Sequence, residues 1–187
     1  GEWHTKAISL HYYTVPTGDW NKKGSATEFS DEEYYETISK TLYMDELIKR
    51  HSEIMSRRDP EGKIGLIVEE GTNPGFLYQQ NTMRDAIVAA CNLNIFNNHS
   101  DKVVMANLAQ AVNVLQALIL TEGEKMVKTP TYHVFDLFKT HQGGELCYSH
   151  ADNCQAGGKI PMISQSASVK DGVLTVTIAN CSIDDDA

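Results

Sequence analysis

The sequence predicts an α/β protein in which a parallel sheet is followed by a smaller antiparallel sheet. As far as about residue 142, short runs of apolar and β-branched residues alternate with patterns of helical spacing. This alternation is typical of βαβ units that build a parallel sheet. Beyond residue 143 the helical spacing stops, and two strand-like runs joined by a tight turn follow.

The first βα unit has a clear start and end. Residues 7–15 are rich in β-branched and aromatic residues, which predicts a buried strand. Ser30 and Glu33 have the spacing of a capping box, so a helix is expected to begin there. Apolar residues recur at helical spacing as far as Met55, and a turn sequence at residues 59–62 ends the pattern.

Further strands and helices follow in the same order. Residues 64–68 and 103–107 are short apolar runs and predict the second and third strands. The apolar residues within 83–96 have helical spacing and predict the helix that connects them. The runs at 111–120 and 131–141 also have helical spacing, so two more helices are expected.

Residues 143–187 predict an antiparallel sheet. Residues 162–169 and 172–180 are β-like runs that meet at Asp171 and Gly172, a pair typical of tight hairpins. Two or three strands do not bury a core alone, and three βα units are fewer than the eight that close a barrel. We therefore expect a carboxy-terminal portion of a larger protein, with a domain boundary near residue 142.

Composition excludes some classes of function. The net charge is −9 and the 16 basic residues are scattered, which argues against nucleic acid as a partner. No apolar run approaches the roughly 20 residues that cross a bilayer, so no membrane partner is expected. Four cysteines in 187 residues fit a reducing compartment, and we expect a cytoplasmic protein. A bridge between Cys147 and Cys154 is one alternative, and a zinc site formed by both with His141 and His150 is another.

Two adjacent carboxylates follow the second strand. Glu69 and Glu70 stand between this strand and a glycine-rich loop. Ligands of parallel α/β sheets bind at the carboxyl ends of the strands, which makes the pair the first candidates for catalysis. Taken alone, such a pair is more often a solvated turn.

Four ordered motifs resemble the α-L-arabinofuranosidases of glycoside hydrolase family 51. They are ISLHYYTVP at residues 8–16, GTNPGFLYQQNT at 71–82, MANLAQAVNVLQ at 105–116 and TPTYHVF at 129–135. The resemblance covers most of residues 7–142. It implies a (β/α)8 barrel followed by an antiparallel β-sandwich, of which this chain supplies barrel strands six to eight and part of the sandwich.

The resemblance also implies an activity. The expected reaction is retaining hydrolysis of terminal non-reducing α-L-arabinofuranosyl residues from arabinose-containing oligosaccharides. Two glutamates carry it out, and neither a cofactor nor a metal is implied. Family members commonly form hexamers, so a homo-oligomer is expected.

Individual site residues follow from the matched motifs. The acid/base glutamate of the family lies before the start of this chain. Counted forward from the second strand, Glu70 falls on the nucleophile, whereas counted backward from Gly71 the nucleophile is missing. His11 and Tyr13 match residues that line the arabinose pocket, and Gln116 matches a glutamine that binds sugar hydroxyls. The alternative function is a non-catalytic carbohydrate-binding or assembly remnant that has lost the nucleophile loop.

Overall fold

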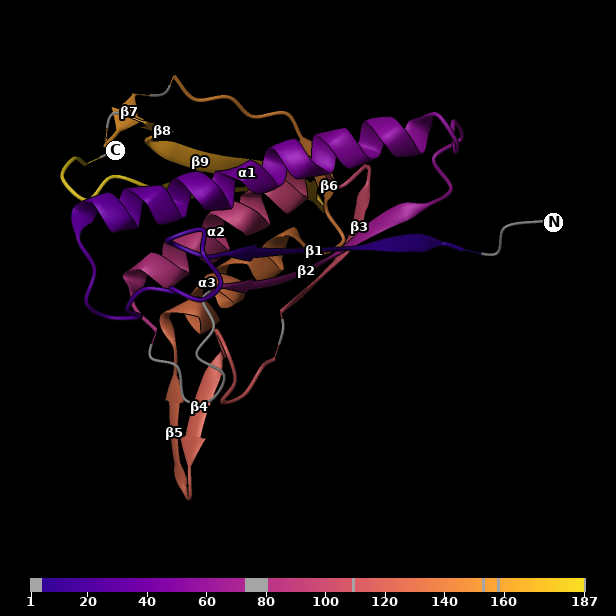
Figure 1. The fold of residues 1–187 in the computed structure, drawn as a ribbon. Helices are drawn as coiled ribbons and strands as arrows, with labels where there is room; N and C mark the ends of the chain where they lie inside the picture. The colour runs from indigo at the N-terminus through magenta and orange to yellow at the C-terminus, as the bar shows by residue number, and fades with distance from the viewer. Residues whose placement is uncertain (1–4, 73–80, 109, 153, 158, 187) are drawn as a thin grey trace.

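The computed structural model describes residues 5–72, 81–108, 110–152, 154–157 and 159–186, with residues 69–72 described by their backbone alone. The first part of the chain forms a three-stranded sheet, here called the parallel sheet, in the order β1-β2-β3. Its strands are β1 (Ala7–Thr14), β2 (Gly65–Thr72) and β3 (Val103–Leu108), connected by α1 (Asp31–Ser56) and α2 (Met83–Asn98). Both strand pairs are parallel (Figure 1). The predicted strands and the helices between them are therefore confirmed.

Helix α1 begins where its capping residues predict. The backbone N–H of Glu33 donates to Ser30 Oγ at 3.3 Å, and the backbone N–H of Ser30 donates to Glu33 Oε2 at 2.9 Å. Asp31, Glu32 and Glu33 place negative charge in the first turn, where the helix dipole favours it. Local chemistry thus fixes the start of α1 without help from the rest of the fold.

The core between the parallel sheet and its helices is apolar. Leu66 and Val68 are two residues apart on β2, so both side chains point to the same face of the sheet, where they are buried. Met44 and Ile48 of α1 pack against them. Residues of α2 and β3 complete this cluster: Ile95, Phe96 and Val103. Both helices therefore cover one face of the parallel sheet.

A three-stranded antiparallel sheet, here called the terminal sheet, follows in the order β10-β9-β6. Its strands are β6 (Glu145–Cys147), β9 (Ile163–Lys170) and β10 (Val173–Asn180), and the short pair β7 (Gln155–Ala156) and β8 (Ile160–Pro161) lies between β6 and β9 in the sequence. Asp171 and Gly172 connect β9 to β10 with φ angles of 51° and 76°. A two-residue turn with both φ angles positive matches the twist of a hairpin, so the hairpin prediction is confirmed.

The terminal sheet packs against α2 through polar side chains. Asn94 Nδ2 donates to the backbone oxygen of Ser164 at 3.0 Å, and Asn97 Nδ2 donates to Ser166 Oγ at 3.0 Å. A second apolar cluster joins α1 and α2 to the last third of the chain. Its buried members are Tyr34, Tyr35, Ile38, Val88, Cys91, Ala156, Ile160, Met162 and Cys181.

The prediction of a helix at residues 111–120 is wrong. Asn113 and Leu115 have φ angles of 61° and 52°, in the left-handed region that a right-handed helix excludes. The Asn113 side chain instead binds the next strand, because its amide nitrogen donates to Thr121 Oγ1 at 2.9 Å and its oxygen accepts from the Thr121 N–H at 2.7 Å. A hairpin of β4 (Ile119–Glu122) and β5 (Lys125–Lys128) follows and projects from the body of the protein (Figure 1).

The predicted helix at residues 131–141 is confirmed as α3 (Pro130–Phe138) followed by the short 3-10 helix η1 (Lys139–His141). Thr129 Oγ1 accepts from the Tyr132 N–H at 3.3 Å, and Pro130 takes the first helical position, where its missing N–H costs nothing. Within the described residues, no helix is both long enough and apolar enough to cross a membrane.

Candidate active site

The three parallel strands bring their carboxyl ends to one edge of the sheet, where the ligands of such sheets bind. The register of the strands defines which residues lie in one row. His11 of β1 is paired with Glu69 of β2, which in turn is paired with Asn107 of β3. Glu70 is paired with Tyr12 and with Leu108.

His11 and Tyr13 lie on the same face of β1. Side chains two residues apart on a strand point to the same face of the sheet. The face that carries His11 and Tyr13 is the one opposite to the helices. Tyr12 points the other way, toward α1, where its hydroxyl donates to the backbone oxygen of Lys40 at 2.9 Å. Tyr13 is 40% exposed. The structure therefore brings two of the predicted site residues together and shows that Tyr12 packs against α1.

The loop after β1 supports Tyr13. The ring of Trp20 meets the ring of Tyr13 edge to face, with centroids 5.7 Å apart. Lys23 Nζ lies 4.6 Å from the centroid of the Trp20 ring. These contacts place an aromatic pair at the carboxyl end of β1.

Glu70 belongs to β2 by its backbone. The side chains of Glu69 and Glu70 lie outside the described part of the structure, and so does most of the glycine-rich loop that follows. The choice of Glu70 as nucleophile consequently stays a prediction.

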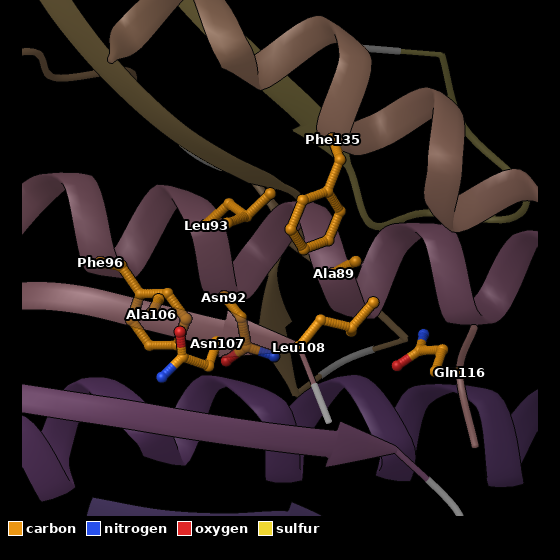
Figure 2. A pocket seen from close by; sticks show the side chains of 9 residues that line it. All are labelled: Ala89, Asn92, Leu93, Phe96, Ala106, Asn107, Leu108, Gln116 and Phe135. Atoms are coloured by element: carbon orange, nitrogen blue, oxygen red, sulfur yellow. The ribbon is translucent and has the colours of Figure 1, made fainter. Parts of the chain in front are cut away.

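Gln116 lies in the segment between β3 and β4. Its side chain is 4% exposed, and its Nε2 donates to the backbone oxygen of Asp85 at 2.8 Å. It lines a small pocket between β3, α2 and α3 (Figure 2). The residues around that pocket are Ala89, Asn92, Leu93, Phe96, Ala106, Asn107, Leu108, Gln116 and Phe135. Neither His11 nor Tyr13 is among them, so this pocket does not bring the three predicted residues together.

The first turn of α2 carries two buried charged residues that the sequence analysis missed. Asp85 is 2% exposed, and its Oδ2 accepts from the Thr82 N–H at 2.7 Å. Burial raises the pKa of the Asp85 carboxyl above its ordinary value. The spacing of Thr82 and Asp85 is a capping signature, which could have identified this residue.

Arg84 connects α2 to the loop after β1. Its side chain is buried, its Nη2 donates to the backbone oxygen of Ser25 at 3.2 Å, and its guanidinium carbon lies 3.8 Å from the centroid of the Phe29 ring. Burial lowers the pKa of Arg84. This contact ties the loop that holds Trp20 to the helix that follows β2. No sequence signal could have found it, because residues 25 and 84 are distant in the chain.

The two alternatives for the cysteine-rich region are not formed. Cys147 and Cys154 are both free thiols. His141 instead contacts two hydroxyls of the terminal sheet, Ser168 Oγ at 2.7 Å and Thr177 Oγ1 at 3.1 Å. Over the described ranges of the chain, no three His, Cys, Asp or Glu side chains come together in a way that could hold a metal ion.

Comparison with known proteins gives a consistent result. The family described as "Alpha-L-arabinofuranosidase C-terminal domain" matches residues 50–182. A curated protein of Bacteroides ovatus, named intracellular exo-alpha-L-arabinofuranosidase, is 43% identical over 95% of this chain and 37% of its own length. The chain thus spans less than two fifths of that relative.

Solved structures agree with the sequence match. The crystal structure of the arabinofuranosidase of glycoside hydrolase family 51 from Xanthomonas axonopodis pv. citri is 45% identical, with a TM-score of 0.82. The arabinose complex of alpha-L-arabinofuranosidase from Thermotoga maritima is 26% identical, with a TM-score of 0.72. Each comparison covers 94% of this chain and 38% of the other one. Because the family matches residues 50–182 and the solved structures agree with it, the chain belongs to the α-L-arabinofuranosidases of glycoside hydrolase family 51 and corresponds to their carboxy-terminal part.

Proposed function

We propose that this protein is an exo-acting α-L-arabinofuranosidase that removes terminal non-reducing arabinofuranosyl residues from arabinose-containing oligosaccharides. The observation that carries the proposal is the 43% identity over 95% of the chain to the relative named intracellular exo-alpha-L-arabinofuranosidase. Because that relative is named intracellular, we also propose a cytoplasmic location. Retaining hydrolysis by two carboxylates needs only water besides the sugar substrate, so the proposal includes no cofactor.

The proposed architecture is a (β/α)8 barrel whose strands six to eight are β1, β2 and β3. The helices cover one face of this sheet, and the opposite face carries Tyr13. After a bulge at Leu66 and Ile67, Met105 is paired with Ile67 and so lies on that face too; Tyr13 and Met105 are 40% and 52% exposed. A barrel interior needs side chains on the face away from the helices, which supports this assignment. Residues 143–187 would then be part of the β-sandwich domain, with the boundary near residue 142.

Roles for the site residues are proposed from the matched motifs, and the carboxyl end of the parallel sheet supports those of His11 and Tyr13. His11 can donate and accept hydrogen bonds with sugar hydroxyls, and the Tyr13 ring offers an apolar face to the sugar. The bond to the Asp85 backbone orients the Gln116 amide, which we assign to a sugar hydroxyl on the β3 side. Glu70 is proposed as the nucleophile, about 5 Å from an acid/base glutamate outside this chain.

A pair of matched variants tests the nucleophile. Glu70 falls on the nucleophile in the forward count of the motif, whereas the backbone register pairs Glu69 with His11, so Glu70→Gln and Glu69→Gln are compared in the same assay. Hydrolysis of p-nitrophenyl α-L-arabinofuranoside should be lost in Glu70→Gln and retained in Glu69→Gln. The reverse result would move the role to Glu69. Retention of activity in both variants would exclude both glutamates.

The activity itself is tested with the unaltered protein. Its intact mass is measured first, and hydrolysis of the same arabinoside is followed by NMR of the anomeric proton, for which we expect the retained anomer as first product. Absence of turnover would leave the non-catalytic carbohydrate-binding or assembly remnant, an alternative that the enzyme names of the relatives do not favour. We also propose a homo-oligomer, with six copies as the family resemblance implies, and light scattering of the same sample tests it.

A further inference from the structure

Two buried thiols lie in contact where the helices of the parallel sheet meet the end of the chain. Cys91 is in the middle of α2, and Cys181 directly follows β10. Both side chains are 0% exposed, and the two sulfur atoms are 3.6 Å apart. They belong to the same apolar cluster, which also includes Tyr34 and Ile38. Because the two residues are 90 positions apart, the contact is made by the tertiary structure alone.

The backbone holds both sulfur atoms near each other. The Cys181 N–H donates to the backbone oxygen of Met162 at 2.7 Å, and the Cys181 oxygen accepts from the Tyr34 hydroxyl at 3.2 Å. Cys91 is fixed by the helical hydrogen bonds of α2. A disulfide bond is about 2.05 Å long, so the sulfur atoms need to approach by only about 1.5 Å. Rotation of the two side chains about their Cα–Cβ bonds can supply this movement.

We propose that Cys91 and Cys181 are a redox modification site, which a peroxide converts into a disulfide joining α2 to the end of β10. A peroxide fits because both sulfur atoms are fully buried, and only a small oxidant reaches them through brief openings of the core. In the cytoplasmic location proposed above, the compartment keeps the pair reduced, and the disulfide forms only when peroxide accumulates.

The reaction balances with hydrogen peroxide as the only co-reactant. The Cys181 thiolate attacks one peroxide oxygen and breaks the O–O bond, which leaves a sulfenic acid, and the released hydroxide takes up a proton to become water. The Cys91 sulfur then attacks the sulfenic sulfur, loses its proton and displaces the second water. Two thiols have given two electrons to the peroxide. The hydrogen bond with Cys91 lowers the pKa of the Cys181 thiol, which favours the thiolate for the first step.

The other two cysteines provide an internal control. Cys154 is exposed and Cys147 is half-buried, and both are free. They are more accessible to an oxidant than the proposed pair, and the Cys147 thiol donates to the backbone oxygen of Glu145 at 3.9 Å rather than to another thiol. If accessibility alone decided oxidation, Cys154 would react and the buried pair would not.

Peptide mapping of the peroxide-treated protein tests the proposal. Remaining thiols are alkylated in denaturant, and the protein is digested with trypsin without reduction. The expected product is the peptide of residues 85–102 cross-linked to the peptide that begins at Asp171, with a mass 2 Da below the sum of the two, and dithiothreitol should separate them. The double variant Cys147→Ser with Cys154→Ser should keep the cross-link, and Cys91→Ser should lose it.

A stability measurement gives a second readout. The disulfide closes a loop of about 90 residues and should raise Tm by about 10 °C in the absence of reductant. The shift should be absent in Cys91→Ser and present in the double serine variant. Recovery of Cys91 and Cys181 as alkylated thiols after Cys154 has been oxidised, or as separate sulfinic acids, would overturn the proposal. Peptide mapping of the unaltered protein shows whether the cross-link between Cys91 and Cys181 forms, even if a variant does not fold.

Discussion

Replacing Asn94 by alanine should weaken the attachment of the terminal sheet to α2. Asn94 is 1% exposed, and its side chain is hydrogen-bonded to three residues of this sheet. Its Oδ1 accepts from Ser166 Oγ at 2.8 Å and from Thr177 Oγ1 at 2.7 Å, and its Nδ2 is shared between the backbone oxygen of Ser164 at 3.0 Å and Ser164 Oγ at 3.3 Å, which we count as one bond. A buried hydrogen bond contributes about 1 kcal/mol net, so the variant should lose about 3 kcal/mol of unfolding free energy.

The remaining contacts of the partners limit the loss. Ser166 Oγ still accepts from Asn97 Nδ2 at 3.0 Å, and Thr177 Oγ1 still contacts His141 Nε2 at 3.1 Å. Neither hydroxyl is left fully unpaired, so the large penalty for burying an unsatisfied polar group does not apply to either of them. The estimate of about 3 kcal/mol therefore counts lost bonds alone.

Asn98 is the matched control. It lies on the same helix but is exposed, and it makes one hydrogen bond to the terminal sheet, from Nδ2 to the backbone oxygen of Gln165 at 2.9 Å. Asn98→Ala should cost less than about 0.5 kcal/mol. Urea unfolding followed by circular dichroism measures both variants, with the slope on denaturant required to stay the same. Equal losses in Asn94→Ala and Asn98→Ala would refute the reasoning.

Three further changes have definite expected results. Ile48→Ala should lower the unfolding free energy by about 2–5 kcal/mol, because the Ile48 side chain is 0% exposed. Ile54 on the same helix is 59% exposed, so Ile54→Ala should change the unfolding free energy by less than about 0.5 kcal/mol. Urea unfolding measures both variants. Burial lowers the pKa of His141 in the folded protein below its ordinary value of 6.5. As the pH falls, the unfolded chain therefore binds a proton at this histidine before the folded protein does. The free energy of unfolding should lose nothing to this group above pH 6.5 and should decrease as the pH drops from 6.5 toward the folded pKa. Thermal unfolding at several pH values checks this, and His141→Gln should flatten the dependence. Ser30→Ala removes the cap of α1 and should cost about 1 kcal/mol in the same unfolding assay, and an unchanged midpoint would contradict the capping role.

Much of the fold could be predicted from local patterns. The capping box at Ser30 fixes the start of α1, and the pair Asp171 and Gly172 fixes the hairpin of β9 and β10, because both depend on residues that are close in the chain. The run at 111–120 misled the same reasoning. Its apolar residues have helical spacing, but the segment does not form a helix. The backbone of Asn113 is left-handed, and its side chain is hydrogen-bonded to Thr121.

The candidate site was only partly predictable. The alternation of a strand places His11 and Tyr13 on one face, and the structure agrees with that. The pairing of Glu69, not Glu70, with His11 depends on the register between β1 and β2, which the sequence of either strand does not specify. The position of Gln116 beside the first turn of α2 depends on a segment whose backbone the sequence analysis predicted wrongly.

The sequence by itself determined the family, the parallel strands, the helices that cover them and the terminal hairpin. These follow from ordered motifs and from interactions within a few residues. The tertiary structure decided which distant residues meet: Cys91 with Cys181, Asn94 with the hydroxyls of the terminal sheet, and Arg84 with the loop after β1. The reason is physical, because these contacts exist only once α2 has docked, and docking depends on packing over the whole core rather than on local propensity.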